Sequence, residues 1–99
     1  MIRIVTRLVC APKNRGAVAA NAPKLIAFFE GAGLKSEGVF ENFHACEIVH
    51  VWSAPSIAAY EEATAKLRAD AAFRAFAGEA AQLIESETKE YWRGLPDGR

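Results

Sequence analysis

Four short stretches of the chain have apolar and polar positions in the pattern of strands, whose side chains point in turn to the two faces of a sheet. The expected strands cover residues 2–10, 35–43, 46–52 and 86–93. In the first strand, Ile4 and Leu8 fall on one face and Arg7 on the other. Because only a short turn separates the second and third strands, they are expected to form a hairpin.

An Ala-rich stretch between the first two strands places apolar residues three and four positions apart, which is the spacing of an amphipathic helix. This helix is expected to continue to Phe29 and to end at Gly31 and Gly33, which suit a C-cap. Pro23 lies inside it and cannot donate a backbone hydrogen bond. Two alternatives stay open: the helix bends at Pro23, or Asn21 caps a shorter helix with Pro23 in its first turn.

A longer helical region is expected between the third and fourth strands, from Ile57 to about Ile84. Ser53 or Ser56 can cap its start, because a serine hydroxyl accepts a hydrogen bond from a free backbone N–H group of the first turn. Asp70 lies between the two halves of this region and is a candidate cap for a second helix segment.

The resulting order of elements, β-α-β-β-α-β, predicts an α+β fold of the ferredoxin-like kind, in which the helices cover one face of a four-stranded antiparallel sheet. The third strand is apolar on both faces: Ile48 and Trp52 accompany His50 on one, and Val49 and Val51 lie on the other. A sheet with one face in water normally alternates between apolar and polar residues. We therefore expect a homodimer, in which a second copy covers the open face and a ligand cavity lies between the two sheets.

Composition agrees with this expectation and excludes several classes of partner. Of the 99 residues, 52% are hydrophobic, which is more apolar surface than a single domain of this size readily hides. The 12 basic and 12 acidic residues leave no net charge and no basic run. Neither nucleic acid nor a membrane surface is therefore an expected partner.

The cysteines and the first residues favour a cytoplasmic protein. Cys10 and Cys46 lie in apolar strand segments without a C-x-x-C pair, as buried thiols do in a reducing compartment. Arg3 and Arg7 interrupt the first apolar run, so it lacks the form of a signal peptide. No stretch approaches the roughly 18 apolar residues of a membrane span.

Several residues in the C-terminal half carry a family resemblance. His50, Val51 and Trp52, the helix from Ile57, the Leu-Arg-Ala-Asp run at residues 67–70 and the two phenylalanines that follow it resemble the NIPSNAP family. This resemblance implies the dimeric α+β barrel fold, which the family shares with cofactor-independent monooxygenases resembling those of antibiotic biosynthesis.

The N-terminal half departs from the family pattern. The family often has an Arg-x-Tyr pair in the first strand and a Pro-Gly turn after it, whereas this strand contains Thr6, Arg7 and Leu8 and its turn has Pro12 and Lys13. No N-terminal site is carried over for this reason. Because the molecular activity of the family is poorly defined, the resemblance implies a fold more than a function.

His50 is the strongest candidate for chemistry, because imidazole exchanges a proton near neutral pH and the third strand would point it into the cavity beside Trp52. The alternative is a hydrogen-bonded core histidine. Trp52 offers a flat apolar wall for an aromatic ligand, or is simply a core residue. Arg7 is expected to enter the same cavity and hold an anionic group of the ligand, with an interface salt bridge as its alternative.

Other reactive side chains make weaker candidates. Cys46, beside His44, lacks an orienting third group, so an inert thiol is expected rather than a nucleophile. Cys46 and His50 would lie about 13 Å apart along one strand, so no metal site is expected. Three acidic residues near the last strand are expected to form a solvated edge: Glu85, Glu87 and Glu90.

The leading hypothesis is a NIPSNAP-like homodimer, without a cofactor, that binds a small hydrophobic or aromatic molecule in a barrel cavity lined by His50, Trp52 and Arg7. The alternative is a cofactor-independent monooxygenase-like or isomerase-like enzyme acting on a small aromatic or polyketide-like substrate, with His50 as its base. A structural or interaction module is a third hypothesis. The sequence contains no phosphate-binding loop, Ser-His-Asp order or pair of catalytic carboxylates.

Overall fold

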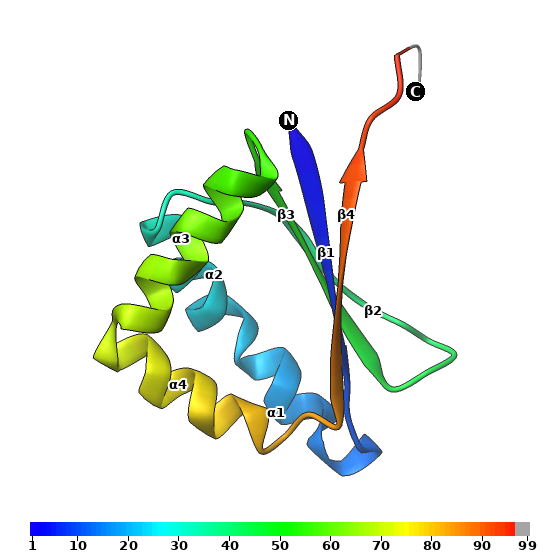
Figure 1. Ribbon diagram of the computed structural model, residues 1–99. Helices are drawn as coiled ribbons and strands as arrows, with labels where there is room; N and C mark the ends of the chain where they lie inside the picture. Colours follow the sequence, from blue (N-terminus) through cyan, green and yellow to red (C-terminus); the bar gives the residue numbers. More distant parts are fainter. Residues whose placement is uncertain (97–99) are drawn as a thin grey trace.

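The computed structural model describes residues 1–96 and contains one antiparallel sheet with its helices gathered on one side (Figure 1). Its elements, in chain order, are β1 (Ile2–Val9), the short 3₁₀ helix η1 (Pro12–Asn14), α1 (Arg15–Ala20), α2 (Ala22–Gly31), β2 (Lys35–Glu41), β3 (Glu47–Ala54), α3 (Ile57–Ala69), α4 (Ala71–Ala81) and β4 (Ser86–Arg93). The predicted strands and helices are all present, with ends within about three residues of those expected from the pattern.

The strand order in the sheet is β2-β3-β1-β4, so β1 pairs with two neighbours, β3 and β4, and the two edges are β2 and β4. This is the arrangement expected of a ferredoxin-like α+β fold, and the fold prediction is confirmed. Within residues 1–96, no helix is both long and apolar enough to cross a membrane.

Side-chain caps explain where the two C-terminal helices begin. The Ser56 hydroxyl accepts a hydrogen bond from the Ala59 backbone N–H (3.1 Å), so Ser56, rather than Ser53, starts α3. The Asp70 carboxylate accepts one from the Ala72 N–H (2.8 Å), which starts α4 and breaks the long helical region in two. The predicted cap at Asp70 is confirmed.

The chain around Pro23 follows the second of the two alternatives, with one difference. α1 ends at Ala20 and α2 begins at Ala22, which places Pro23 in the first turn, where its missing N–H costs no helical hydrogen bond. Asn21 occupies the cap position, but its backbone stays helical (φ −76°, ψ −15°) and its side chain makes no capping hydrogen bond. The chain therefore passes from α1 to α2 through one residue with helical backbone angles, and not through a loop that reverses its direction.

Two buried clusters fill the space between sheet and helices. The first has Ile4, Trp52 and Tyr60 at its centre, and the second has Leu8 and Ile48. Because side chains alternate along a strand, the even-numbered residues of β1 and β3 face the helices and the odd-numbered ones face away.

The opposite face of the sheet is partly apolar, and no helix or strand among residues 1–96 covers it (Figure 1). Val49 and Val51 are half-buried there, and Phe40 and Trp92 are each 56% exposed. The predicted two-sided apolar character of the third strand is thus present in the structure. Pairing with a second copy stays a prediction.

Candidate functional site

A cavity of about 220 Å³ lies between the helix-facing side of the sheet and the helices. Its walls are mostly apolar and come from both layers. The larger side chains among them are Leu25, Phe29, Trp52, Leu67, Phe73 and Phe76. Apolar walls lower the local polarity, which strengthens any hydrogen bond that a ligand makes there.

A row of three polar residues crosses the sheet beneath this cavity. Thr6 on β1 is paired with His50 on β3 and with Lys89 on β4, and all three line the cavity. The next row along β1 is formed by Ile4 with Trp52 and Tyr91, so the polar row adjoins an aromatic one. The sheet therefore presents hydrogen-bonding groups along one line of an otherwise apolar floor.

His50 is the most deeply buried polar residue of this row, with 1% of its surface exposed. Its ring lies almost parallel to that of Trp52, with centroids 5.5 Å apart and 11° between the planes. Its Nδ1 atom is buried and finds no hydrogen-bond partner among residues 1–96. Burial lowers the pKa of His50 from 6.5 to about 4, because the charged imidazolium loses its hydration. His50 is accordingly a neutral imidazole at physiological pH.

Trp52 forms the aromatic part of the cavity wall and is also 1% exposed. One neighbour is His50, and another is Phe29 of α2, whose ring centroid is 4.4 Å from that of Trp52. Trp52 therefore belongs to the core and to the cavity wall at once, so the two interpretations of this residue do not exclude each other.

Further polar groups line the cavity from α3 and β4, besides Asn21 between α1 and α2. The Lys89 ammonium lies 5.0 Å from the centroid of the Tyr60 ring. Burial raises the pKa of the Tyr60 hydroxyl, and the Lys89 charge partly opposes this rise. Thr64 donates its hydroxyl proton to the Glu61 carbonyl (3.0 Å), which leaves its oxygen free to accept a hydrogen bond.

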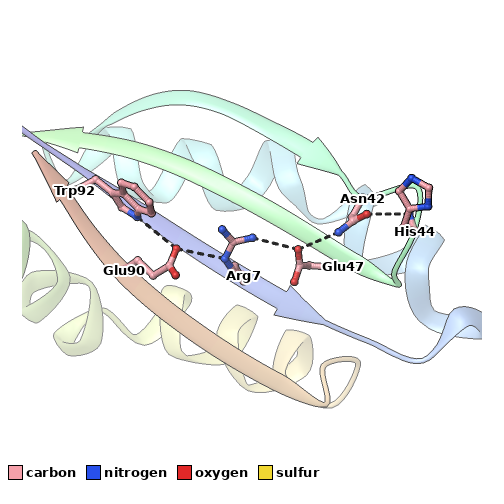
Figure 2. Close-up of polar contacts among 6 residues, drawn as sticks. All are labelled: Arg7, Asn42, His44, Glu47, Glu90 and Trp92. Carbon is pink, nitrogen blue, oxygen red and sulfur yellow. Dashed lines mark hydrogen bonds and ion pairs between the residues drawn. The ribbon is translucent and has the colours of Figure 1, made fainter. Parts of the chain in front are cut away.

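Arg7 lies on the opposite face of the sheet from this cavity, which corrects the expectation that it joins His50 and Trp52 there. Its Nη1 atom is 3.3 Å from Glu47 Oε1, and its Nε atom is 3.3 Å from Glu90 Oε1 (Figure 2). The reason is the alternation along β1: Ile4 and Leu8 face the helices, so Arg7 must face away from them.

One other expectation also changes. Glu87 lines the cavity, whereas Glu90 faces the open side of the sheet, so the acidic residues of β4 do not form one solvated edge. His44 lies in the exposed β2–β3 turn, where its backbone N–H donates to Asn42 Oδ1 (2.8 Å) (Figure 2). No three His, Cys, Asp or Glu side chains among the described residues lie close enough together to hold a metal ion.

The pattern of the sequence did not single out Thr6, Lys89, Tyr60 or Thr64 as site residues. Thr6 and Lys89 become neighbours of His50 only through strand register, which depends on how β1 pairs with β3 and β4. Tyr60 and Thr64 are four residues apart on one face of α3, and this spacing could have indicated that they share surroundings.

Comparison with known proteins extends the fold prediction. No protein-family model and no curated protein sequence matches the chain. An uncharacterized NIPSNAP domain protein from Burkholderia xenovorans matches with a TM-score of 0.88 at 10% identity, over 98% of this chain and 97% of the other. A NIPSNAP family protein from Agrobacterium tumefaciens matches with a TM-score of 0.86 at 18% identity, over 99% of this chain and 97% of the other.

The structure is also similar to a protein described as an antibiotic biosynthesis monooxygenase. The TM-score is 0.73 at 14% identity, over 97% of this chain and 100% of the other. These matches confirm, at the level of fold, the resemblance that the C-terminal half of the sequence indicated. They leave the activity to be argued from the cavity itself.

Proposed function

We propose that this protein binds a small, predominantly apolar molecule, of the size of one or two aromatic rings, in the cavity between sheet and helices. The observation that carries the proposal is the cavity itself, an apolar space of about 220 Å³ with one polar row on its floor. For comparison, an apolar cavity of roughly 150 Å³ holds a benzene molecule.

The polar row supports a ligand that carries a hydroxyl or carbonyl group on one edge. His50 is neutral, so one ring nitrogen can accept a hydrogen bond and the other can donate one. A buried imidazole without a partner lowers stability, and a ligand hydrogen bond would offset part of that cost. Trp52 and Phe29 provide flat apolar surface for the rest of the ligand.

We propose in addition that two copies of the chain pair through their open sheet faces. Arg7 is already paired with Glu47 and Glu90 within its own chain, so its charge needs no partner across an interface. The half-buried valines and the exposed Phe40 and Trp92 supply its apolar area. In a symmetric dimer the same face of each chain meets its copy, so one apolar face per chain is sufficient for such pairing.

The binding proposal is tested with 2-naphthol as probe and naphthalene as its counterpart without a hydroxyl group. Amide chemical shifts of the labelled protein report both the affinity and the location of binding. Replacing Ala77, which lines the cavity, by Leu should weaken binding of both probes about tenfold, because the added side chain occupies ligand space. His50→Phe should weaken 2-naphthol alone, by roughly fivefold, through the loss of one hydrogen bond.

Ala75→Leu is the matched control for the cavity variant. Ala75 lies on the same helix, is exposed and does not line the cavity, so this variant should bind as the wild type does. Shifts that spread over the open sheet face, or an Ala77→Leu variant with unchanged affinity, would contradict binding in the cavity.

A second candidate function is catalysis by a cofactor-independent, monooxygenase-like enzyme. It is favoured by the similarity in fold to the antibiotic biosynthesis monooxygenase and by a mostly apolar cavity that contains a neutral imidazole. A pKa of about 4 makes His50 a weak base, which is why binding is the leading proposal.

Oxygen uptake with one- and two-ring phenols distinguishes the two functions. An enzyme that uses His50 as its base should lose roughly 100-fold in rate in the His50→Ala variant. A binding protein should show no turnover in either form and only a weaker affinity in the variant.

A further inference from the structure

Two cysteines lie directly opposite each other where the sheet ends. Cys10 follows the last residue of β1 and Cys46 precedes the first residue of β3, so the pair continues the register in which Val9 is opposite Glu47. The Cys10 backbone N–H donates to the Cys46 carbonyl (3.1 Å), and the two Sγ atoms are 3.5 Å apart. Both thiols are free.

The two thiols differ in their surroundings. Cys10 is 2% exposed and packs with Leu8, Val18 and Ile48. Cys46 is only half-buried and ends the short turn between β2 and β3. A soluble reagent can therefore reach Cys46 first, while Cys10 stays behind it as an enclosed second thiol.

We propose that Cys10 and Cys46 form a redox modification site, which closes to an intrachain disulfide by exchange with a low-molecular-weight disulfide such as oxidised glutathione. The Cys46 thiolate attacks one sulfur of the reagent, forms a mixed disulfide and releases one thiolate. Cys10 then loses its proton and attacks Cys46 Sγ, which releases the second thiolate. The protein gives up two electrons and two protons, and one reagent molecule becomes two thiols.

The geometry needed for this bond is nearly present in the reduced chain. Directly opposite residues of an antiparallel pair have Cα atoms about 4.5–5.5 Å apart, inside the range of about 4.4–6.8 Å found for disulfides. The two sulfur atoms have to approach by only about 1.5 Å to reach bonding distance. Cys46 lies in a turn and can make this adjustment more easily than a residue inside a strand.

The pKa of the Cys10 thiol fits an exchange in which Cys46 reacts first and Cys10 second. Burial raises the pKa of the Cys10 thiol, and the neighbouring Cys46 adds to this rise. Among the other charged groups near Cys10, Arg15 lowers the pKa and Glu85 raises it. Cys10 is thus the slower thiolate to form, which suits the second step of the exchange.

Closure would tie the β2–β3 turn to the end of β1, next to one end of the cavity. Leu8 and Val18 pack against Cys10 and also line the cavity, so the disulfide would stiffen part of its wall. Since the bond also links residues far apart in sequence, it should raise the Tm by at least about 5 °C. This site does not depend on the proposed binding function.

The test uses the wild-type chain equilibrated in glutathione buffers of increasing oxidised fraction, with free thiols then trapped by an alkylating reagent. Intact-mass and peptide analysis should show a monomeric chain that has lost two hydrogen atoms and contains a Cys10–Cys46 peptide. In Cys10→Ala, the same buffers should instead leave glutathione attached to Cys46.

Three results would overturn the proposal. They are wild-type thiols that stay reduced in the most oxidising buffer, a stable glutathione adduct on the wild type without ring closure, and disulfides that form only between chains. Each is read on the wild-type protein, so the outcome does not depend on whether a variant folds.

Discussion

Acidification should destabilise this protein through His50 in particular. The folded chain holds His50 with a pKa of about 4, whereas an unfolded chain returns it to about 6.5. Between these two values the unfolded state binds a proton that the folded state does not bind. Stability therefore rises with pH across this window, and it is lost as the pH falls from 6.5 towards 4.

The magnitude follows from the difference between the two pKa values. The complete loss, reached below the folded pKa, is about 3 kcal/mol. Between about pH 7.5 and pH 5 the expected loss is about 2 kcal/mol, which is a large part of the 5–15 kcal/mol stability typical of a folded domain. The cause is desolvation, because burial penalises the charged imidazolium.

Urea unfolding followed by circular dichroism, at fixed protein concentration and several pH values, measures this effect. The wild type is compared with His50→Gln, which cannot gain a charge, and with His44→Gln, which replaces the exposed histidine of the turn. Carboxylates titrate in all three proteins, so the difference between the wild type and His50→Gln isolates His50. Equal losses of stability in these two proteins would refute the idea that burial keeps His50 neutral.

Two further changes test the fold and the assembly. Asp70→Ala should lower the free energy of unfolding by about 1 kcal/mol, because the first N–H groups of α4 lose their acceptor; urea unfolding measures it, and an unchanged midpoint would contradict a capping role. Val51→Lys, at the middle of the open sheet face, should shift the chain to monomers in sedimentation velocity, whereas Ala75→Lys on the exposed side of α4 should not. A wild type that sediments as a monomer at micromolar concentration would end the pairing proposal.

Much of the architecture is local in origin, so the sequence pattern was sufficient for it. Strand-like patterns marked all four strands, and Asp70 together with either Ser53 or Ser56 marked the helix starts, because capping is a matter of a few neighbouring backbone groups. The placement of His50 and Trp52 on one buried face also followed from strand period alone.

Which residues line the cavity, in contrast, depends on how distant segments of the chain pair with one another. Arg7 was assigned to the wrong side because the sequence does not say which face of β1 borders the cavity. Along the chain, His50 is 44 positions from Thr6 and 39 positions from Lys89. Only the pairing of three strands sets these residues in one row. Register is a long-range property: it depends on which apolar residues of distant segments pack together, and no local pattern contains that information.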